Sequence, residues 1–309
     1  MTLPKAVTLV EVGPRDGLQN EPNPVPTEVK LHYIRLLAES GLRVIEATSF
    51  VSPKWVPQLA DAEQVMVNLP RQPGVRFPVL VPNQKGLERA LQAGATEIAI
   101  FTAASQTFCQ RNLNRTIQES LAEYAQVVSQ ARQANCRVRA YISTALVCPY
   151  EGDIAPEQVV PIVEQLLAMG VDEISLGDTI GAGVPTQVAR LTEQVLTQVP
   201  ADRIAYHFHN TYGTALANVL TALQMGITTF DSSAGGLGGC PFAPGATGNL
   251  ATEDLLYMLH KMGIETGVNL ERVVEAGRYI LQALNRATPP SHYLQATTPC
   301  AVPKSVDVW

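Results

Sequence analysis

Short apolar segments alternate with longer amphipathic segments along most of the 309-residue chain. The short segments are rich in β-branched and aliphatic residues, which is typical of buried strands. The longer ones repeat apolar residues every three or four positions, as in helices that bury one face. This pattern predicts strands at 7–10, 42–47, 76–81, 96–101, 137–146, 173–176, 203–209 and 228–231. It predicts the intervening helices at 28–40, 57–68, 84–93, 117–128, 156–169, 185–198, 216–223 and 251–262.

Eight strand–helix units, repeated roughly every 30 residues, predict an α/β fold of the (β/α)8 or TIM barrel type. An open doubly wound sheet would favour a glycine-rich phosphate loop after the first strand, but the turn there reads Gly13-Pro14-Arg15-Asp16. We therefore expect a catalytic barrel over residues 1–263. A C-terminal segment, 264–309, is expected to add an amphipathic helix at 270–286 and an irregular, proline-rich tail.

The apolar face of that extra helix must be covered either by the barrel or by a partner subunit, so a homodimer is expected while closure within one chain stays open. Net charge is −6 without a Lys/Arg block, which argues against nucleic-acid binding. The sequence has no run of about 18 apolar residues, so no membrane span is expected. The first strand begins close to Met1, which leaves no room for a leader peptide.

The cysteines are scattered, odd in number and free of any CxxC pair, which favours reduced thiols and a cytoplasmic location. They are Cys109, Cys136, Cys148, Cys240 and Cys300.

Active sites of TIM barrels lie where the carboxyl ends of the strands meet. The polar residues at the predicted strand ends are Arg15, Asp16, Glu46, Ser49, Thr102, Thr144, Asp178, His207, His209 and Ser232. Thr144 is a candidate for substrate binding. Taken alone, Arg15-Asp16 would be an ordinary surface ion pair. In this set, we expect both side chains to point into the barrel mouth and not at each other.

The sharpest motif is His207-Phe208-His209, at the end of the seventh predicted strand. Residues two apart on a strand share a face, so both imidazoles can chelate one metal while Phe208 turns toward the helices. A single such histidine is usually a hydrogen-bonded core residue, but two of the five histidines of the chain end this strand. With Asp16 they predict a mixed nitrogen–oxygen site for Mg²⁺, Mn²⁺ or a similar ion, rather than a closed zinc site.

The stretch from Ala234 to Asn249 is rich in Gly and Pro. A flexible surface connection is one interpretation, and a lid over the active face is the other, which we favour. Cys240 at its centre could deliver a proton or line the pocket. Asn249 could cap the following helix or supply an oxygen ligand to the metal.

Six segments, in order along nearly the whole chain, resemble the 3-hydroxy-3-methylglutaryl-CoA lyase family. They are EVGPRDGLQNE (11–21), IEATSFVSPKWVPQLAD (45–61), CPYEG (148–152), EISLGDTIGAG (173–183), HFHNTYGTALAN (207–218) and GLGGCPFAPGATGNLATEDLLYML (236–259). The resemblance implies a TIM barrel that cleaves this acyl-CoA to acetyl-CoA and acetoacetate with Mg²⁺ or Mn²⁺.

By the same resemblance, the metal ligands are Asp16, His207, His209 and Asn249, the catalytic arginine is Arg15, the active-site carboxylates are Glu46 and Asp178, the loop cysteine is Cys240, and Ser49 lies near the substrate. Asn210 departs from the family, where Asp is frequent, and the segment 101–114 is less typical. Acyl-chain preference is therefore less firmly implied than the metal site.

The residues also suit the chemistry. A retro-aldol (Claisen-type) cleavage deprotonates a tertiary hydroxyl and stabilises an enolate; a divalent ion serves the first step and Arg15 the second. Asp16, Glu46 and His207 remain open as the base, and Cys240 is a candidate proton donor. Three alternatives are a lyase for longer acyl chains, an enzyme condensing acetyl-CoA with a 2-oxo acid, and an inactive metal-binding barrel.

Overall fold

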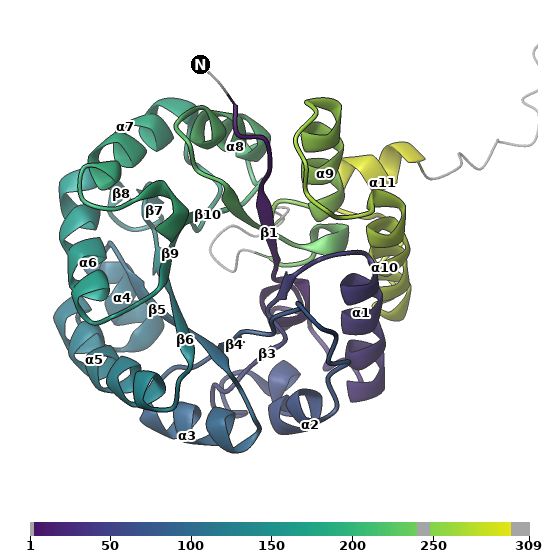
Figure 1. Cartoon of the computed structure of the whole chain (residues 1–309), viewed down its shortest axis with the longest axis horizontal. Coiled ribbons are helices and arrows are strands. Elements are labelled where there is room, and N and C mark those ends of the chain that lie inside the picture. Colours follow the sequence, from purple (N-terminus) through teal and green to yellow (C-terminus); the bar gives the residue numbers. More distant parts are fainter. Residues whose placement is uncertain (1–2, 240–247, 298–309) are drawn as a thin grey trace, which may run out of the picture.

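The computed structural model describes residues 3–239 and 248–297. Figure 1 shows a ring of strands surrounded by helices, the arrangement of a TIM barrel. In the described ranges the ring contains nine parallel strand segments, hydrogen-bonded in the order β2-β1-β11-β10-β9-β6-β5-β4-β3. They are β1 (Thr8–Glu11), β2 (Val44–Ile45), β3 (Thr48–Ser49), β4 (Val79–Leu80), β5 (Glu97–Ala103), β6 (Arg137–Ser143), β9 (Glu173–Asp178), β10 (Ile204–Phe208) and β11 (Thr229–Ser232). The predicted barrel is confirmed.

The helices follow the strands around the outside of the ring (Figure 1). They are α1 (Thr27–Glu39), α2 (Ala62–Val67), α3 (Gln84–Gln92), α4 (Gln106–Leu113), α5 (Ile117–Gln133), α6 (Pro156–Ala168), α7 (Pro185–Leu196), α8 (Ala215–Gln224), α9 (Thr252–Lys261), α10 (Leu270–Ala283) and α11 (His292–Thr297). Short helical turns, η1 (Gly13–Gly17) and η4 (Ala234–Gly236), follow β1 and β11. None of the described helices is long and apolar enough to cross a membrane.

The structure differs from the expected elements at four places. The second predicted strand is interrupted at Glu46-Ala47, so β2 pairs with β1 while β3 pairs with β4. Helix α4 was not predicted; the Ser105 side chain caps it by accepting the Phe108 N–H at 3.0 Å. An antiparallel hairpin, β7 (Val147–Cys148) and β8 (Gly152–Asp153), leaves the barrel after β6. The expectation of an irregular tail is wrong over α11.

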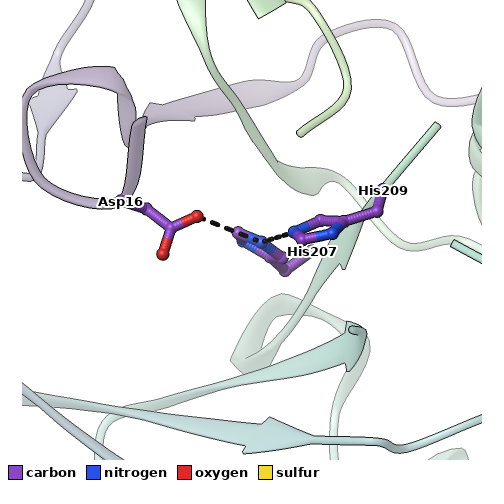
Figure 2. Close-up of side chains that lie close together, drawn as sticks. All are labelled: Asp16, His207 and His209. Carbon is purple, nitrogen blue, oxygen red and sulfur yellow. Dashed lines mark hydrogen bonds and ion pairs between the residues drawn. The ribbon is translucent and has the colours of Figure 1, made fainter. Parts of the chain in front are cut away.

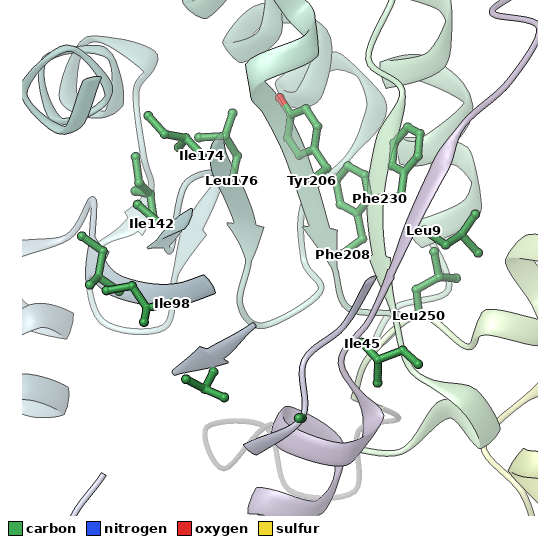
Figure 3. Packing of buried hydrophobic residues seen from close by; sticks show 14 of the residues in the cluster. Leu9, Ile45, Ile98, Ile142, Ile174, Leu176, Tyr206, Phe208, Phe230 and Leu250 are labelled. Carbon is green, nitrogen blue, oxygen red and sulfur yellow. The ribbon is translucent and has the colours of Figure 1, made fainter. Parts of the chain in front are cut away.

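The core lies between the strands and the helices, where Figure 3 shows aliphatic and aromatic side chains packed together. Phe208 faces this layer, as predicted, and stacks on Tyr206 with ring centroids 4.9 Å apart. The inside of the barrel also holds buried charged residues beside small apolar clusters such as Val10, Val12 and Val44. Arg139 of β6 donates to Asp231 of β11 at 2.6 Å, which joins strands that are not neighbours in the sheet. Alternation along the strands therefore sends most apolar residues outward and brings the buried charged residues inward.

Helix α10 packs against α1 and η4 through its apolar face. Gly277 is needed there, since a Cβ at this position would lie 2.3 Å from the Glu253 Oε1 atom. The stripe that suggested a homodimer is thus buried within one chain, and homodimerisation stays a prediction.

Candidate active site

Arg15 and Asp16 lie on η1, the turn that ends β1 on the active face. The Val12 carbonyl accepts the N–H groups of both residues, at 3.2 and 2.7 Å. Gly13 makes this turn possible, because a Cβ there would lie 2.4 Å from the Tyr33 hydroxyl. The short Gly-Pro entry therefore fixes both functional side chains on a rigid backbone.

Arg15 joins two carboxylates. Its Nε donates to Glu46 Oε2 at 2.7 Å and its Nη1 donates to Asp16 Oδ1 at 2.6 Å. The expectation that Arg15 and Asp16 do not point at each other is wrong: they form an ion pair, although Arg15 is only 6% exposed. Burial explains the difference, since a desolvated guanidinium needs countercharges. Arg15 still lines the cavity described below.

His207 lies at the end of β10 and His209 directly follows this strand, and both face Asp16 across the barrel mouth (Figure 2). Their Nε2 atoms lie 3.2 Å apart, and His207 Nε2 lies 4.0 Å from Asp16 Oδ2. His207 Nδ1 contacts Asp231 Oδ2 at 3.1 Å. This carboxylate sits beside His207 in the sheet register and holds the imidazole with Nε2 toward Asp16.

Asn249 completes the group from the other side of η4. Its Nδ2 donates to Asp16 Oδ2 at 2.8 Å and to the Leu237 carbonyl at 3.0 Å. Both partners are acceptors, so they fix the orientation of the amide and leave Oδ1 buried without a hydrogen-bond partner. Asn249 does not cap α9, whose N-cap is Ala251. Of the two expectations for this residue, only the ligand remains.

The charges around the cluster set its protonation. Burial by itself would raise the pKa of Asp16, but Arg15 and the two imidazoles hold that pKa well below its usual range. Burial and the charge of His207 lower the pKa of His209 to about 4. Burial opposes the charged form of His207, yet the contact with Asp231 raises its pKa above the usual value. At neutral pH Asp16 is thus a carboxylate and His209 a neutral imidazole, the forms in which these two groups bind a metal.

The donor set fits a divalent cation. Ligands at adjacent corners around an ion with bonds of about 2.1 Å lie roughly 3 Å apart, close to the spacing of the two Nε2 atoms. The orphaned Asn249 Oδ1 offers a further oxygen. Two imidazoles and a carboxylate are typical of a catalytic divalent-metal site with open positions rather than of a closed structural zinc site.

A cavity of about 640 Å³ opens in front of this cluster, within the usual size of small-molecule sites. Arg15, Asp16, His207 and His209 line one end. The other end is formed by loops after β3, β4 and β5 and by α4, including Trp55, Asn83, Phe108, Arg111 and Arg115.

The remaining predicted residues divide into two groups. Glu46 and Asp178 are fully buried beside the cluster; the Asp178 carboxylate accepts the N–H of Gly183 at 3.1 Å, and burial raises its pKa to about 6. Ser49 and Thr144 are buried but do not line the cavity. The Thr144 hydroxyl donates to the Ser143 carbonyl at 2.7 Å. Cys240 lies outside the described residues.

Sequence reasoning missed two residues of the site. Tyr141 lines the cavity, donates to Glu46 Oε2 at 3.2 Å and lies under the Arg15 guanidinium. Asp231 accepts from Arg139 at 2.6 Å and Ser175 at 2.9 Å besides contacting His207. Strict alternation along the predicted fifth and eighth strands would have placed both on the inner face.

A family model described as HMGL-like matches residues 6–280. The chain belongs to the HMGL-like family. The bovine mitochondrial hydroxymethylglutaryl-CoA lyase is 56% identical over 96% of this chain and 91% of its own length. The rat cytoplasmic 3-hydroxy-3-methylglutaryl-CoA lyase is 55% identical over 93% and 83%.

The fold also resembles that of a solved structure. The HMG-CoA lyase of Bacillus subtilis superposes with a TM-score of 0.94 at 52% identity, covering 96% of this chain and 99% of its own. The HMGL-like match spans β1 through most of α10, so every described residue of the candidate site lies inside it.

Proposed function

We propose that this protein cleaves 3-hydroxy-3-methylglutaryl-CoA to acetyl-CoA and acetoacetate. The observation that carries the proposal is the Asp16, His207 and His209 cluster at one end of a cavity that also holds Arg15. It is supported by relatives named as HMG-CoA lyases, at 55–56% identity.

Mg²⁺ or Mn²⁺ would be held by Asp16, His207, His209 and Asn249. Such an ion lowers the pKa of a coordinated hydroxyl and orients it. The chain itself prepares the ligands: Asp231 fixes the His207 ring, and Asp16 and Leu237 fix the Asn249 amide.

Arg15 is the proposed electrophile of the reaction. A guanidinium has five N–H donors, and with Nε and one Nη1 hydrogen engaged about three remain for the substrate. When the bond between C2 and C3 breaks, its electron pair moves onto the thioester, and these donors stabilise the enolate oxygen. The position of Arg15 between Glu46 and Asp16 keeps its charge in place.

The reaction needs two proton transfers, one that accompanies the cleavage and one that follows it. A base removes the C3 hydroxyl proton as that oxygen becomes the ketone of acetoacetate, and Asp16, Glu46 and His207 are the candidates. Asp178, with its pKa raised by burial to about 6, is a further carboxyl beside His207 that can carry a proton near neutral pH. Cys240 is the proposed donor to C2 of the enolate, which gives acetyl-CoA. Ser49 and Thr144 support the walls behind the cavity rather than the substrate itself.

The test is product analysis with 3-hydroxy-3-methylglutaryl-CoA, with Mg²⁺, with Mn²⁺ and with chelator. We expect acetoacetate and acetyl-CoA in equal amounts with either metal, and none after chelation. Absence of acetoacetate under every metal condition would refute the proposal. Faster turnover of a longer 3-hydroxy-3-alkylglutaryl-CoA in the same assay would shift the substrate assignment but keep the chemistry.

We further propose that the protein works in a reducing compartment such as the cytoplasm. The described cysteines Cys109, Cys136 and Cys148 are free and buried, which supports this. Relatives carry both cytoplasmic and mitochondrial names.

A further inference from the structure

Glu11 is the last residue of β1 and is fully buried, yet it faces away from the cavity. Its Oε1 atom accepts the N–H of Gly13 at 2.8 Å and the N–H of Ala234 at 2.9 Å. Its Oε2 atom accepts the Thr252 hydroxyl at 2.7 Å. One carboxylate therefore joins three segments that are remote in sequence: the start of η1, the start of η4 and the first residue of α9.

Two of these segments, η1 and η4, also come together at the proposed metal ligands. The Asn249 amide bonds to the Leu237 carbonyl, just after η4, and to Asp16 Oδ2, on η1. The contacts close a ring, which runs through Glu11, Gly13, Asp16, Asn249, Leu237 and Ala234. The two oxygen ligands proposed for the metal lie on one side of this ring and Glu11 lies on the other.

The ring leaves no room for a side chain at two glycine positions in or next to it. A Cβ on Gly13 would lie 2.6 Å from Glu11 Oε1, and a Cβ on Gly238 would lie 2.5 Å from Asn249 Nδ2. A second buried carboxylate, Glu253, accepts the next N–H of η4, that of Gly235, at 2.8 Å. A shift of η1 or η4 would therefore break hydrogen bonds of buried groups, which is costly.

We propose that Glu11 is a positioning residue that fixes the spacing of Asp16 and Asn249 and thereby the metal affinity of the site, without touching metal or substrate. This inference rests on the metal ligands assigned under the proposed function. Glu11 would thus influence metal affinity from the outer side of β1, in the layer between the strand and the helices. The role is geometric: what matters is one oxygen that accepts two backbone N–H groups.

The geometric role predicts a difference between two substitutions. In Glu11→Gln the amide oxygen can still accept from Gly13 and Ala234, while the NH₂ group meets the Thr252 hydroxyl, which can accept. In Glu11→Met the side chain keeps a similar length but offers no comparable acceptor, so both N–H groups lose their partner.

The experiment is calorimetric titration of Mn²⁺ into the metal-free full-length protein, with thermal melts of the same samples. Loss of a residue that orients ligands typically weakens metal affinity by 10–100-fold, and we expect Glu11→Met to raise the Kd by about that factor. Glu11→Gln should bind Mn²⁺ nearly as the wild type does. Thr252→Val, which removes a bond to the same carboxylate outside the ring, should also keep the wild-type Kd.

Glu97→Gln controls for the loss of a buried carboxylate as such, because Glu97 pairs with Arg76 at the far end of β5. It should lower the melting temperature without changing the Mn²⁺ affinity. If Glu11→Met does not fold, Ala234→Pro removes the same N–H donor from the other side, at a position where a helical turn begins. The same rise in Kd is expected.

An unchanged Kd in Glu11→Met, or in Ala234→Pro where that variant is used, would overturn the inference. So would a Glu11→Gln variant as weak as Glu11→Met, which would show that charge and not position matters. These results are separable from the proposed function. Wild-type protein that forms acetoacetate, together with loss of Mn²⁺ binding in Asp16→Ala, keeps the lyase assignment even when the role of Glu11 fails.

Discussion

Replacing Arg15 by glutamine separates the structural role of this residue from its role in the reaction. The largely buried guanidinium bonds the fully buried Glu46 at 2.7 Å and the partly buried Asp16 at 2.6 Å. Removing one partner of a buried ion pair costs about 3–5 kcal/mol, because the other charge stays buried. For 309 residues, an unfolding entropy of about 2.1 cal/mol/K per residue converts this loss into a fall in Tm of roughly 5–8 °C.

The kinetic effect has a different origin. Loss of one donor to a developing oxyanion typically lowers kcat by 10²–10³-fold, and we expect Arg15→Gln to lose at least about that factor. Acetoacetate formation at saturating substrate and Mn²⁺, measured well below the lowered Tm, gives kcat directly. KM should change far less, since the donors act on charge that appears only during cleavage.

A matched control comes from Arg76. Its Nη1 atom lies 2.7 Å from Oε1 of the buried Glu97, and neither residue lines the cavity. Arg76→Gln should lower Tm and leave kcat unchanged. If Arg15→Gln destabilises the protein but keeps kcat within about tenfold of the wild type, Arg15 only supports the fold and the assignment of the electrophile is refuted.

Three further predictions concern the surroundings of the site. Gly238→Ala, at φ +115° with its new Cβ 2.5 Å from Asn249 Nδ2, should weaken Mn²⁺ binding in a titration while Gly170→Ala does not. Mn²⁺ at about 100 times its Kd should stabilise the wild type by about 2.7 kcal/mol in melts, and His209→Ala but not His260→Ala should abolish this. Burial raises the pKa of Glu253 from 4.5 to about 8, so stability should fall as pH rises through that window, and less so in Glu253→Gln urea melts.

The barrel was predictable because its periodicity is local: each strand and helix carries its own alternation. The interruption at Glu46-Ala47 was not, because it follows from pairing with β1 on one side and β4 on the other. Helix α11 was missed for a similar reason. Its first N–H groups are accepted by Asp254 on α9, at 3.1 Å for His292 and 2.7 Å for Tyr293, so the cap comes from a distant part of the chain.

The cluster of Asp16, His207 and His209 was predictable, because a barrel brings the ends of its strands together whatever their side chains are. Orientation was not. Arg15 turns toward Asp16 and Glu46 because burial demands countercharges, and that demand appears only once the barrel is closed. Tyr141 was missed because it lies well before the end of the predicted strand 137–146, and Asp231 because its partners Arg139 and His207 come from other strands.

The order of the strands has a consequence for how such an enzyme can diversify. The proposed ligands come from β1, from the end of β10 and from the segment after β11, three neighbours on one side of the ring (Figure 1). The facing wall is built from α4 and from the loops that follow β4 and β5. The proposed metal ligands and this wall thus lie on different arcs of the barrel, so we expect substitutions in α4 and in the loops after β4 and β5 to change the accepted acyl group while the ligands stay the same.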